Sequence, residues 1–329
     1  MQDWWVGAWL AFVFGAMVGS FLNVVVCRLP QGQSVVFPSS HCPNCHAAIR
    51  PWHNIPILGF LWLQGRCADC RAPISWRYPV TEALTGGLFL ATYWHFAWSW
   101  QSLWLFLFVG LLVAIFWIDW DTMLIFDAMT LPGAFLGLAY SGLVLERFWL
   151  ALAAALGAVA LLLLLNSVTL WWMGVDGVGE GDMTLVAMLG AWLGVEGCVV
   201  ALGTALCVAS LMGLAVVYAG WGRERRWQPW GLALIASCAI YALTAYVTAL
   251  PAGIAYGWLG AHLAPTIWCA LLLASLFMGG ATGWLYMRLT AQTPSLVMPF
   301  GPALVLGALV ALFCGEPVWS SVRTWLWLS

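Results

Sequence analysis

Apolar residues occur in long, nearly uninterrupted runs, which is the pattern of a protein that crosses a membrane many times. A membrane-spanning helix needs about 20 consecutive apolar residues. Runs of this kind predict about ten crossings, at residues 5–27, 80–98, 101–118, 128–146, 148–170, 183–196, 198–220, 230–250, 266–288 and 297–314. The run at 183–196 is short, and we expect it to be tilted or partly re-entrant. The pattern therefore predicts an all-α polytopic membrane protein.

Composition agrees with this pattern and excludes several classes of protein. Hydrophobic residues make up 64% of the 329 residues, charged residues make up 7%, and the mean hydropathy is +0.93. Soluble domains carry roughly 25% charged residues, so a soluble enzyme, a disordered protein and a secreted disulfide module are excluded. The net charge of −2 does not indicate a nucleic-acid partner. We expect most of the chain to be surrounded by membrane lipid.

One polar segment, residues 28–79, interrupts the apolar runs. It holds five of the eleven arginines, four of the ten cysteines and three of the five histidines. The first apolar run has no basic segment before it and ends at Arg28, so we interpret it as a retained helix rather than a cleaved signal peptide. The predicted divisions are a first span (1–27), a small polar domain (28–79), a membrane core (80–220), additional membrane segments (221–290), and a last span with its tail (291–329).

The arginines predict the orientation of the chain, which contains no lysine. If residues 28–79 lie in the cytoplasm, alternation of the spans puts nine arginines inside and two, Arg147 and Arg323, outside. This is a strong positive-inside bias. The same alternation places the loops at 119–127 and 171–182 on the cytoplasmic face.

Six of the thirteen acidic residues gather in these two loops, namely Asp119, Asp121, Asp127, Asp176, Glu180 and Asp182. Asp119 ends one apolar run and Asp182 begins another, so both are expected at or just below the membrane surface. An ionisable residue at that depth indicates a functional site. Glycines at positions 177, 179 and 181 (Gly177, Gly179 and Gly181) precede Asp182, where they allow tight turns and close approach of another chain.

Two carboxylates that are held together can share one proton. The ionised carboxylate then activates water while the protonated one polarises the scissile carbonyl, as in aspartic proteases. The spacing does not show that positions 119 and 182 meet, and it does not choose between Asp119 and Asp121. Two other interpretations stay open: the acids cap helices or lie in solvated loops, or they bind Ca²⁺ or Mg²⁺.

The polar segment contains two C-x-x-C motifs, Cys42-Pro-Asn-Cys45 and Cys67-Ala-Asp-Cys70, with 21 residues between them. Four thiolates at this spacing predict a closed, structural zinc site, and the segment is therefore expected to be a zinc-ribbon-like domain. The alternatives are two disulfides or four free thiols, and a reducing cytoplasm argues against disulfides. Other candidate ligands are the nearby histidines His41, His46 and His53.

Several motifs, taken in order, resemble those of the bacterial type IV prepilin peptidases, which are membrane aspartic peptidases of the GxGD type. The motifs are Gly19-Ser-Phe-Leu-Asn23, Pro38-Ser-Ser-His-Cys42-Pro-Asn-Cys45, Ile74-Ser-Trp-Arg-Tyr-Pro79 with Glu82, Asp119 with Asp127, Gly179-Glu-Gly-Asp182, Gly190-Ala-Trp-Leu-Gly194 and Pro299-Phe-Gly-Pro302. The resemblance covers roughly residues 15–200 and the end of the chain.

The resemblance implies an enzyme of the bacterial inner membrane that cleaves a short basic leader from prepilins or type II secretion pseudopilins. Cleavage would follow a glycine at the cytoplasmic face, and many members then methylate the new N terminus with S-adenosylmethionine. By position, Asp119 and Asp182 would be the catalytic pair. The acids that would support the pair and attract a basic leader are Asp121, Asp127, Asp176 and Glu180. Assembly proteins of a pilus or secretion system are further candidate partners.

Two positions beside the predicted site depart from the family pattern. Thr184 stands where lysine is usual, and Ile125-Phe126 stands where leucine-proline usually precedes Asp127. Altered substrate choice and reduced activity are both open. The alternative functions are a broader intramembrane aspartic protease and a non-catalytic scaffold or transporter. A transporter would place its acids near the middle of the bilayer, whereas these acids lie at the ends of apolar runs.

Overall fold

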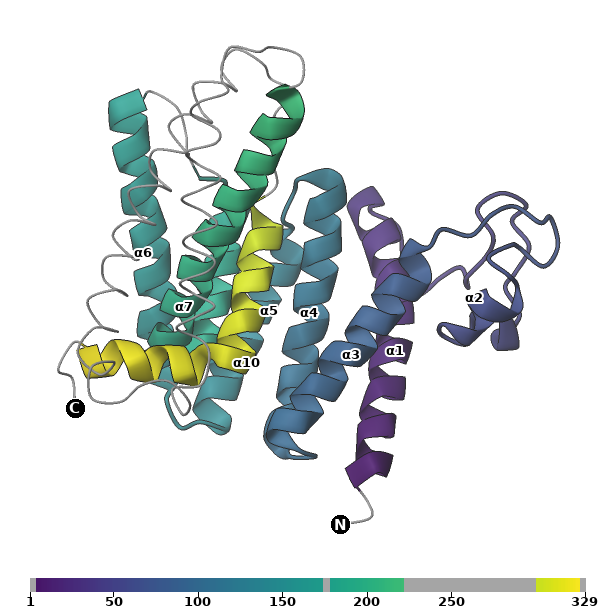
Figure 1. The fold of residues 1–329 in the computed structure, drawn as a ribbon, viewed down its shortest axis with the longest axis horizontal. Helices are drawn as coiled ribbons and strands as arrows, with labels where there is room; N and C mark the ends of the chain where they lie inside the picture. Colours follow the sequence, from purple (N-terminus) through teal and green to yellow (C-terminus); the bar gives the residue numbers. More distant parts are fainter. Residues whose placement is uncertain (1–3, 174–177, 222–299, 326–329) are drawn as a thin grey trace.

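The structure, a computed structural model, describes residues 4–173, 178–221 and 300–325 (Figure 1). Its helices are α1 (Trp4–Arg28), α2 (Leu58–Trp62), α3 (Arg77–Phe96), α4 (Trp100–Thr122), α5 (Asp127–Leu143), α6 (Phe148–Met173), α7 (Glu180–Trp221) and α10 (Gly301–Trp325). Short 3-10 turns cover Leu29–Gln31 and Pro51–Asn54. The predicted additional spans at 230–250 and 266–288 lie outside the described residues.

The described residues are mostly helical, and their apolar helices are consistent with a membrane protein. Four of them contain stretches that are long and apolar enough to cross a bilayer, at Trp4–Gln31, Trp100–Thr122, Phe148–Val168 and Glu180–Ala205. The predicted number of ten crossings stays a prediction. The two runs predicted at 183–196 and 198–220 fall in one element, α7, which is broken at Gly194, where φ is 68° and ψ is −172°.

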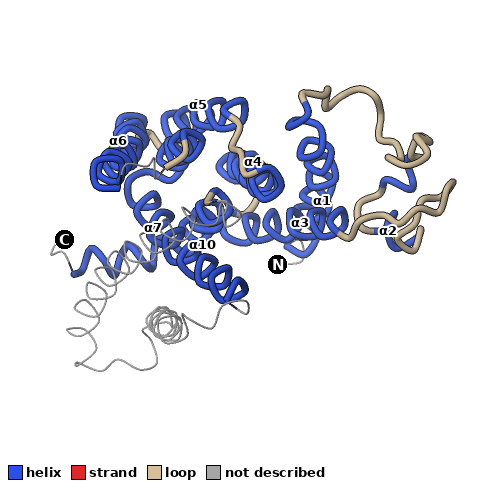
Figure 2. The backbone as a smooth tube through the Cα atoms, turned by 90° about the horizontal axis from the view of Figure 1, so that it is seen from above, coloured by secondary structure: helices blue, strands red, loops and turns tan. Residues whose placement is uncertain are grey.

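Helix α4 lies at the centre of the described fold. Helices α1 and α3 pack on one side of it, and α5, α7 and α10 lie on the other (Figure 2). Because α4 is apolar on all sides, it can be buried along most of its length. Phe108, Leu112 and Ile118 are fully buried side chains of this helix.

Small residues let the helices approach closely, as is common in membrane bundles. A Cβ atom on Gly15 of α1 would lie 2.7 Å from the Cβ atom of Phe89 in α3. Between α6 and α7, a Cβ on Gly190 would lie 2.7 Å from the Ala155 Cα. These contacts leave no room for a larger residue at either glycine.

The first half of α7 is fixed by Trp192. Its indole stacks on Phe108 of α4 at 4.8 Å between ring centroids and on Tyr140 of α5 at 5.2 Å. The indole Nε1 donates a 2.7 Å hydrogen bond to the Gly133 carbonyl of α5. The Ser141 hydroxyl of α5 donates a 2.7 Å bond to the Ala191 carbonyl. Together these contacts hold the start of α7 against α4 and α5.

The small domain between α1 and α3 has little regular structure. Two isolated antiparallel bridges, His41 with Ala48 and Arg66 with Pro73, close its two C-x-x-C turns. Within residues 32–76 the buried residues are Cys42, Gly59 and Cys67. A segment with so small a core needs another source of stability, such as a metal.

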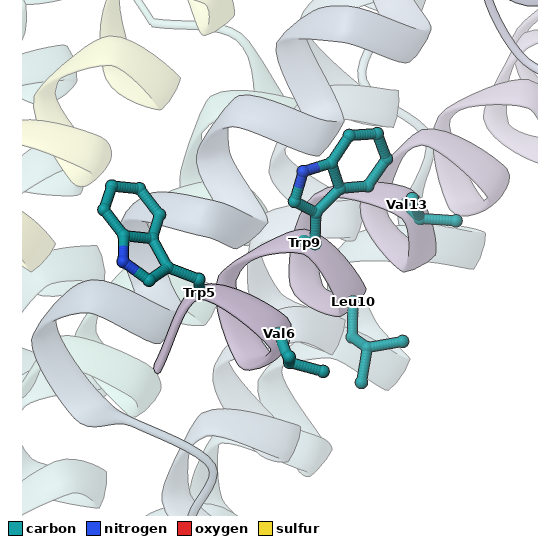
Figure 3. A pocket seen from close by; sticks show the side chains of 5 residues that line it. All are labelled: Trp5, Val6, Trp9, Leu10 and Val13. Atoms are coloured by element: carbon teal, nitrogen blue, oxygen red, sulfur yellow. The ribbon is translucent and has the colours of Figure 1, made fainter. Parts of the chain in front are cut away.

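A shallow apolar groove lies on the surface of α1. All of its lining residues come from this one helix: Trp5, Val6, Trp9, Leu10 and Val13 (Figure 3). The lining contains no ionisable side chain. It is the surface expected of a helix that faces lipid tails, and it offers no catalytic chemistry.

Candidate functional site

Asp119 lies in the last turn of α4 and is 3% exposed. The Gly301 backbone N–H at the start of α10 donates a hydrogen bond to its carboxylate. The Oδ2 atom of this carboxylate is buried and has no well-aligned hydrogen-bond partner among the described residues. Met123, in the left-handed conformation with φ 54°, ends the helix by donating its N–H to the Asp119 carbonyl at 2.8 Å. The carboxylate is therefore held in a sparsely hydrogen-bonded pocket.

Asp182 is the third residue of α7 and is half-buried. Its carboxylate accepts a hydrogen bond from the Gly179 backbone N–H, and its own N–H donates to the Gly179 carbonyl at 3.2 Å. This is a helix-capping arrangement, so Asp182 does cap its helix. Its charge also interacts with that of Asp119. The carboxyl groups of positions 119 and 182 therefore lie near enough for their charges to interact, where the ends of α4, α7 and α10 meet.

Glycines allow this meeting of α4, α7 and α10. A Cβ on Gly181 would lie 2.8 Å from the Cβ of Ile125, in the loop that follows α4. A Cβ on Gly301 would lie 3.0 Å from the Asp119 Cγ and 3.1 Å from the Ile125 Cδ1. Any side chain at these positions would push the helix ends apart.

Thr184 joins the start of α7 to the start of α5. Its hydroxyl donates a 2.9 Å hydrogen bond to the Asp127 Oδ1 and accepts a 2.9 Å bond from the Thr130 hydroxyl. A neutral hydroxyl thus provides the link between the two helices. This contact ties the first turn of α7, which also carries Asp182, to the start of α5.

Asp121, which the sequence could not distinguish from Asp119, faces a different way. It is partly exposed and forms an ion pair with Arg77 at the start of α3, with 2.5 Å between the Nη1 and Oδ2 atoms. The guanidinium also lies 4.5 Å from the Trp117 ring centroid. Asp121 therefore connects α4 to the exit of the small domain, while the buried Asp119 carboxylate lies beside Gly301.

The other predicted acids and glycines are distributed around this centre. Asp127 is the first residue of α5 and is bonded to Thr184, and Glu180 is exposed at the start of α7. Gly179 caps α7. Asp176 and Gly177 lie outside the described residues.

Two functional contacts were missed from the sequence. Gly301 is remote from Asp119 in the chain, and it lies in the motif Pro299-Phe-Gly-Pro302, whose spacing gives no indication that it meets Asp119. Glu82 of α3 is buried, and its Oε2 accepts a 2.7 Å hydrogen bond from the Ile57 N–H of the small domain. In the same region, the Asn23 side-chain amide of α1 donates to the Tyr78 carbonyl at 3.2 Å. Glu82 therefore fastens the small domain to α3, and Asn23 joins α1 to the start of α3.

The four predicted thiols form a cluster whose Sγ atoms all lie within 4.8 Å of one another. The Cys42–Cys70 and Cys45–Cys67 Sγ distances are 3.8 and 4.0 Å. A tetrahedral zinc ion with Zn–S bonds of about 2.3 Å separates its sulfurs by roughly 3.8 Å, so the thiols fit zinc. Among the described residues, the four thiols are the one cluster in which three or more potential metal ligands lie close together. The acidic residues form no such cluster there.

Local donors favour the thiolate form that zinc requires. The backbone N–H groups of Cys45 and Asn44 lower the pKa of Cys42. The Ala72 backbone N–H and the Asn44 side-chain amide lower the pKa of Cys70 to about 6. One thiol of each C-x-x-C motif is therefore favoured as the thiolate, whereas burial and the neighbouring thiols raise the pKa of Cys45 to about 12.

Two family descriptions match the chain. The bacterial peptidase A24 N-terminal domain matches residues 13–96, which contain α1, the small domain and α3. The type IV leader peptidase family matches residues 105–245, which contain both Asp119 and Asp182.

Curated proteins named prepilin leader peptidase/N-methyltransferase are similar to the chain over most of their length. The protein of Neisseria gonorrhoeae is 41% identical over 233 residues, which is 62% of this chain and 79% of the relative. That of Aeromonas hydrophila is 38% identical over 242 residues, or 65% and 82% of the two chains. That of Pseudomonas aeruginosa is 38% identical over 221 residues, or 56% and 74%. No solved structure matches the chain.

Proposed function

The chain belongs to the type IV leader peptidase family, and we propose that Asp119 and Asp182 are the pair with which it cleaves prepilin leaders. Its activities are those of a prepilin leader peptidase and N-methyltransferase.

The observation that carries the catalytic assignment is the buried Asp119 carboxylate, which has one unpartnered oxygen and lies within electrostatic range of Asp182. A purely structural acid at this depth would be fully hydrogen-bonded, because an unpaired buried carboxylate is costly. A site that must accept water and a peptide carbonyl needs free acceptor capacity instead. Asp121 forms an ion pair with Arg77, and Asp127 accepts a hydrogen bond from Thr184. These partners favour a supporting role for both residues rather than a catalytic one.

The pair supports the general acid–base mechanism of aspartic proteases. With one proton shared between the carboxyl groups, the ionised group removes a proton from water, and the resulting hydroxide attacks the scissile carbonyl carbon. The protonated group donates its hydrogen bond to the carbonyl oxygen as this becomes the oxyanion. The tetrahedral intermediate then breaks its C–N bond, and the leaving amine takes up a proton from a carboxyl group. The Gly301 N–H holds the Asp119 carboxylate in place during both steps.

N-methylation comes after cleavage, and its substrate is the amine that cleavage releases at the carboxylate centre. The leaving amine is the new N terminus of the pilin, and it is released beside the two carboxyl groups. An ionised carboxylate can accept the proton that an ammonium group must lose before it attacks a methyl donor. S-adenosylmethionine supplies the methyl group when bound.

We further propose that the site and the tetra-cysteine domain face the cytoplasm in the bacterial inner membrane. The Arg77–Asp121 ion pair supports a common side for the two, since it joins the exit of the small domain to the end of α4. The predicted arginine distribution supports the cytoplasm as that side. Zinc held by Cys42, Cys45, Cys67 and Cys70 would be structural. Pseudopilins and the assembly proteins of a pilus or type II secretion system are the candidate partners.

The test of function is cleavage of a synthetic prepilin by the purified chain in lipid, followed by mass spectrometry. The expected products are the free leader and a mature pilin that gains the mass of one methyl group when S-adenosylmethionine is added. A second substrate with its junction glycine replaced by a bulky residue should not be cut. Cleavage of both substrates would indicate the broader intramembrane protease, and cleavage of neither would favour the scaffold or transporter.

A further inference from the structure

The short helix α2 of the small domain presents an apolar face that no described residue covers. Leu58, Leu61 and Trp62 are spaced at i, i+3 and i+4, which places them on one side of the helix. They are 60%, 59% and 72% exposed. An exposed helix in water normally carries polar residues on its outer face. The outer face of α2 is instead apolar, which favours contact with an apolar medium.

The inner side of α2 is already packed. Gly59 is buried against the His53 carbonyl, and the Phe60 ring lies 4.7 Å from the Trp76 ring. Rotation of α2 to hide its leucines would therefore expose these contacts. The apolar face is a fixed feature of the domain.

The charge around this face is strongly biased. Residues 28–79 contain five arginines and one acidic residue, Asp69, which gives this segment a formal charge of +4. Arg28 and Arg77 are engaged, in bonds to the Pro38 carbonyl and to Asp121. The remaining three (Arg50, Arg66 and Arg71) are exposed. A small domain that exposes both an apolar face and several arginines complements a surface that is apolar inside and anionic at its rim.

The position of α2 brings it to such a surface. The small domain is joined at one end to the span Trp4–Gln31 and at the other to α3. The Ile57 N–H, one residue before α2, donates to Glu82 in the second turn of α3. In both views the small domain lies to the side of α1 and α3 (Figures 1 and 2). The hydrogen bond between Ile57 and Glu82 thus holds the start of α2 close to helix α3.

We propose that α2 docks on the anionic phospholipid surface of the adjacent membrane leaflet. Leu58, Leu61 and Trp62 enter the boundary between headgroups and acyl chains, where tryptophan is favoured. The exposed arginines bind the anionic headgroups, and their apolar stems lie along the membrane surface. The tetra-cysteine domain is then an interfacial domain. Neither leader cleavage nor methylation by itself requires this contact, so the inference goes beyond the proposed function.

The test is photo-cross-linking in the full-length, zinc-loaded chain, reconstituted into vesicles. A p-benzoylphenylalanine residue replaces Trp62 in one variant and Asp69 in a matched control. Position 69 is also exposed in the small domain, and its native carboxylate indicates a side of the domain that does not face an anionic surface. The vesicles are phosphatidylcholine alone or phosphatidylcholine with phosphatidylglycerol. The expected result is lipid adducts at position 62, with a higher yield on phosphatidylglycerol, and no adducts at position 69.

A second variant separates charge from apolar insertion. Combining Arg50→Gln, Arg66→Gln and Arg71→Gln with the probe at position 62 should remove the preference for phosphatidylglycerol, and 1 M salt should do the same because it shortens the screening length to about 3 Å. If the probe at position 62 disturbs zinc binding, a probe in place of Leu61 repeats the experiment. Zinc-loaded protein without lipid adducts at either position would overturn the proposal, as would adducts to a second copy of the chain or equal lipid adducts at position 69.

Discussion

The carboxylate centre and the tetra-cysteine domain are built in opposite ways. Around Asp119 and Asp182, long apolar helices pack through glycines and stacked aromatic rings, and this packing alone brings two distant chain segments together. The tetra-cysteine domain has almost no buried side chains apart from Cys42 and Cys67. Its order must come from the four thiols and from hydrogen bonds to α1 and α3. The comparison shows that one chain can position its chemistry by helix packing in one region and by ligand geometry in another.

If this comparison is right, loss of a thiol should have the largest effect on structure and should be confined to the small domain. Binding of structural zinc contributes on the order of 10 kcal/mol, so Cys67→Ser should release the metal and unfold residues 32–76. Limited proteolysis should then cut within this segment while α4 and α7 stay protected, and the zinc content should fall. Cys198→Ser, a buried cysteine of α7, is the matched control and should keep the metal. Protection of residues 32–76 in the zinc-free variant would break the comparison.

The close approach of Gly301 to Asp119 should make this glycine the most sensitive position of the carboxylate centre outside the pair itself. In Gly301→Ala, the new methyl group would displace the Asp119 carboxylate, and a displacement of about 1 Å can cost about 100-fold in rate. Leader cleavage should fall by this order while zinc content is unchanged.

The matched control is Gly315→Ala on the same helix, where an added Cβ meets no atom within 4 Å. It should retain its activity. Equal losses in the two variants would mean that helix α10 is sensitive throughout and that Gly301 has no special relation to Asp119.

A smaller effect is expected at the hydrogen bonds that join α5 to α7. Thr184→Val keeps the shape of the side chain but removes the hydroxyl that bonds to Asp127. One such bond contributes about 1 kcal/mol, which corresponds to about a fivefold change in rate. The loss should appear in kcat with little change in KM, and Thr184→Ser should restore most of the rate. A normal kcat in Thr184→Val would show that this link does not position Asp182.

The smallest effect is expected at the ion pair between Arg77 and Asp121. Both side chains are partly exposed, and such pairs contribute about 0–1 kcal/mol. Arg77→Gln and Asp121→Asn should therefore each keep leader cleavage within about fivefold of the wild-type rate. A double-mutant cycle on the cleavage rate measures the pair directly. A loss comparable to that of Gly301→Ala would mean that the small domain takes part in positioning α4.

Much of the fold could be predicted from the apolar runs, because the bilayer requires helices of nearly uniform length. The runs at 101–118 and 148–170 correspond to α4 and α6. The position of the break in α7 could not be predicted, because Gly194 lies among other small and apolar residues that give no local signal. The spacing of the cysteines was sufficient to predict that their four sulfurs meet.

The details of the carboxylate centre were less accessible from sequence. Asp119 and Asp121 both follow a run that is apolar on every side, so periodicity did not show which of them faces the bundle. The distinction arises from tertiary contacts: Arg77 takes Asp121, and Gly301 approaches Asp119. Arg77 and Gly301 are both remote in sequence from the aspartates that they contact, so a local sequence pattern could not predict these contacts. The role of Thr184 was hidden for the same reason, since its partners lie on α5.

The measurement that tests the central claim most directly is the rate of prepilin cleavage in lipid by Asp119→Asn, Asp182→Asn and Asp121→Asn, with zinc content measured in each preparation. Asparagine keeps the shape of the side chain and removes its acid–base chemistry. The account predicts that the first two variants lose cleavage by about 1,000-fold or more with zinc retained, while Asp121→Asn stays active. Cleavage by all three variants would contradict a mechanism based on Asp119 and Asp182.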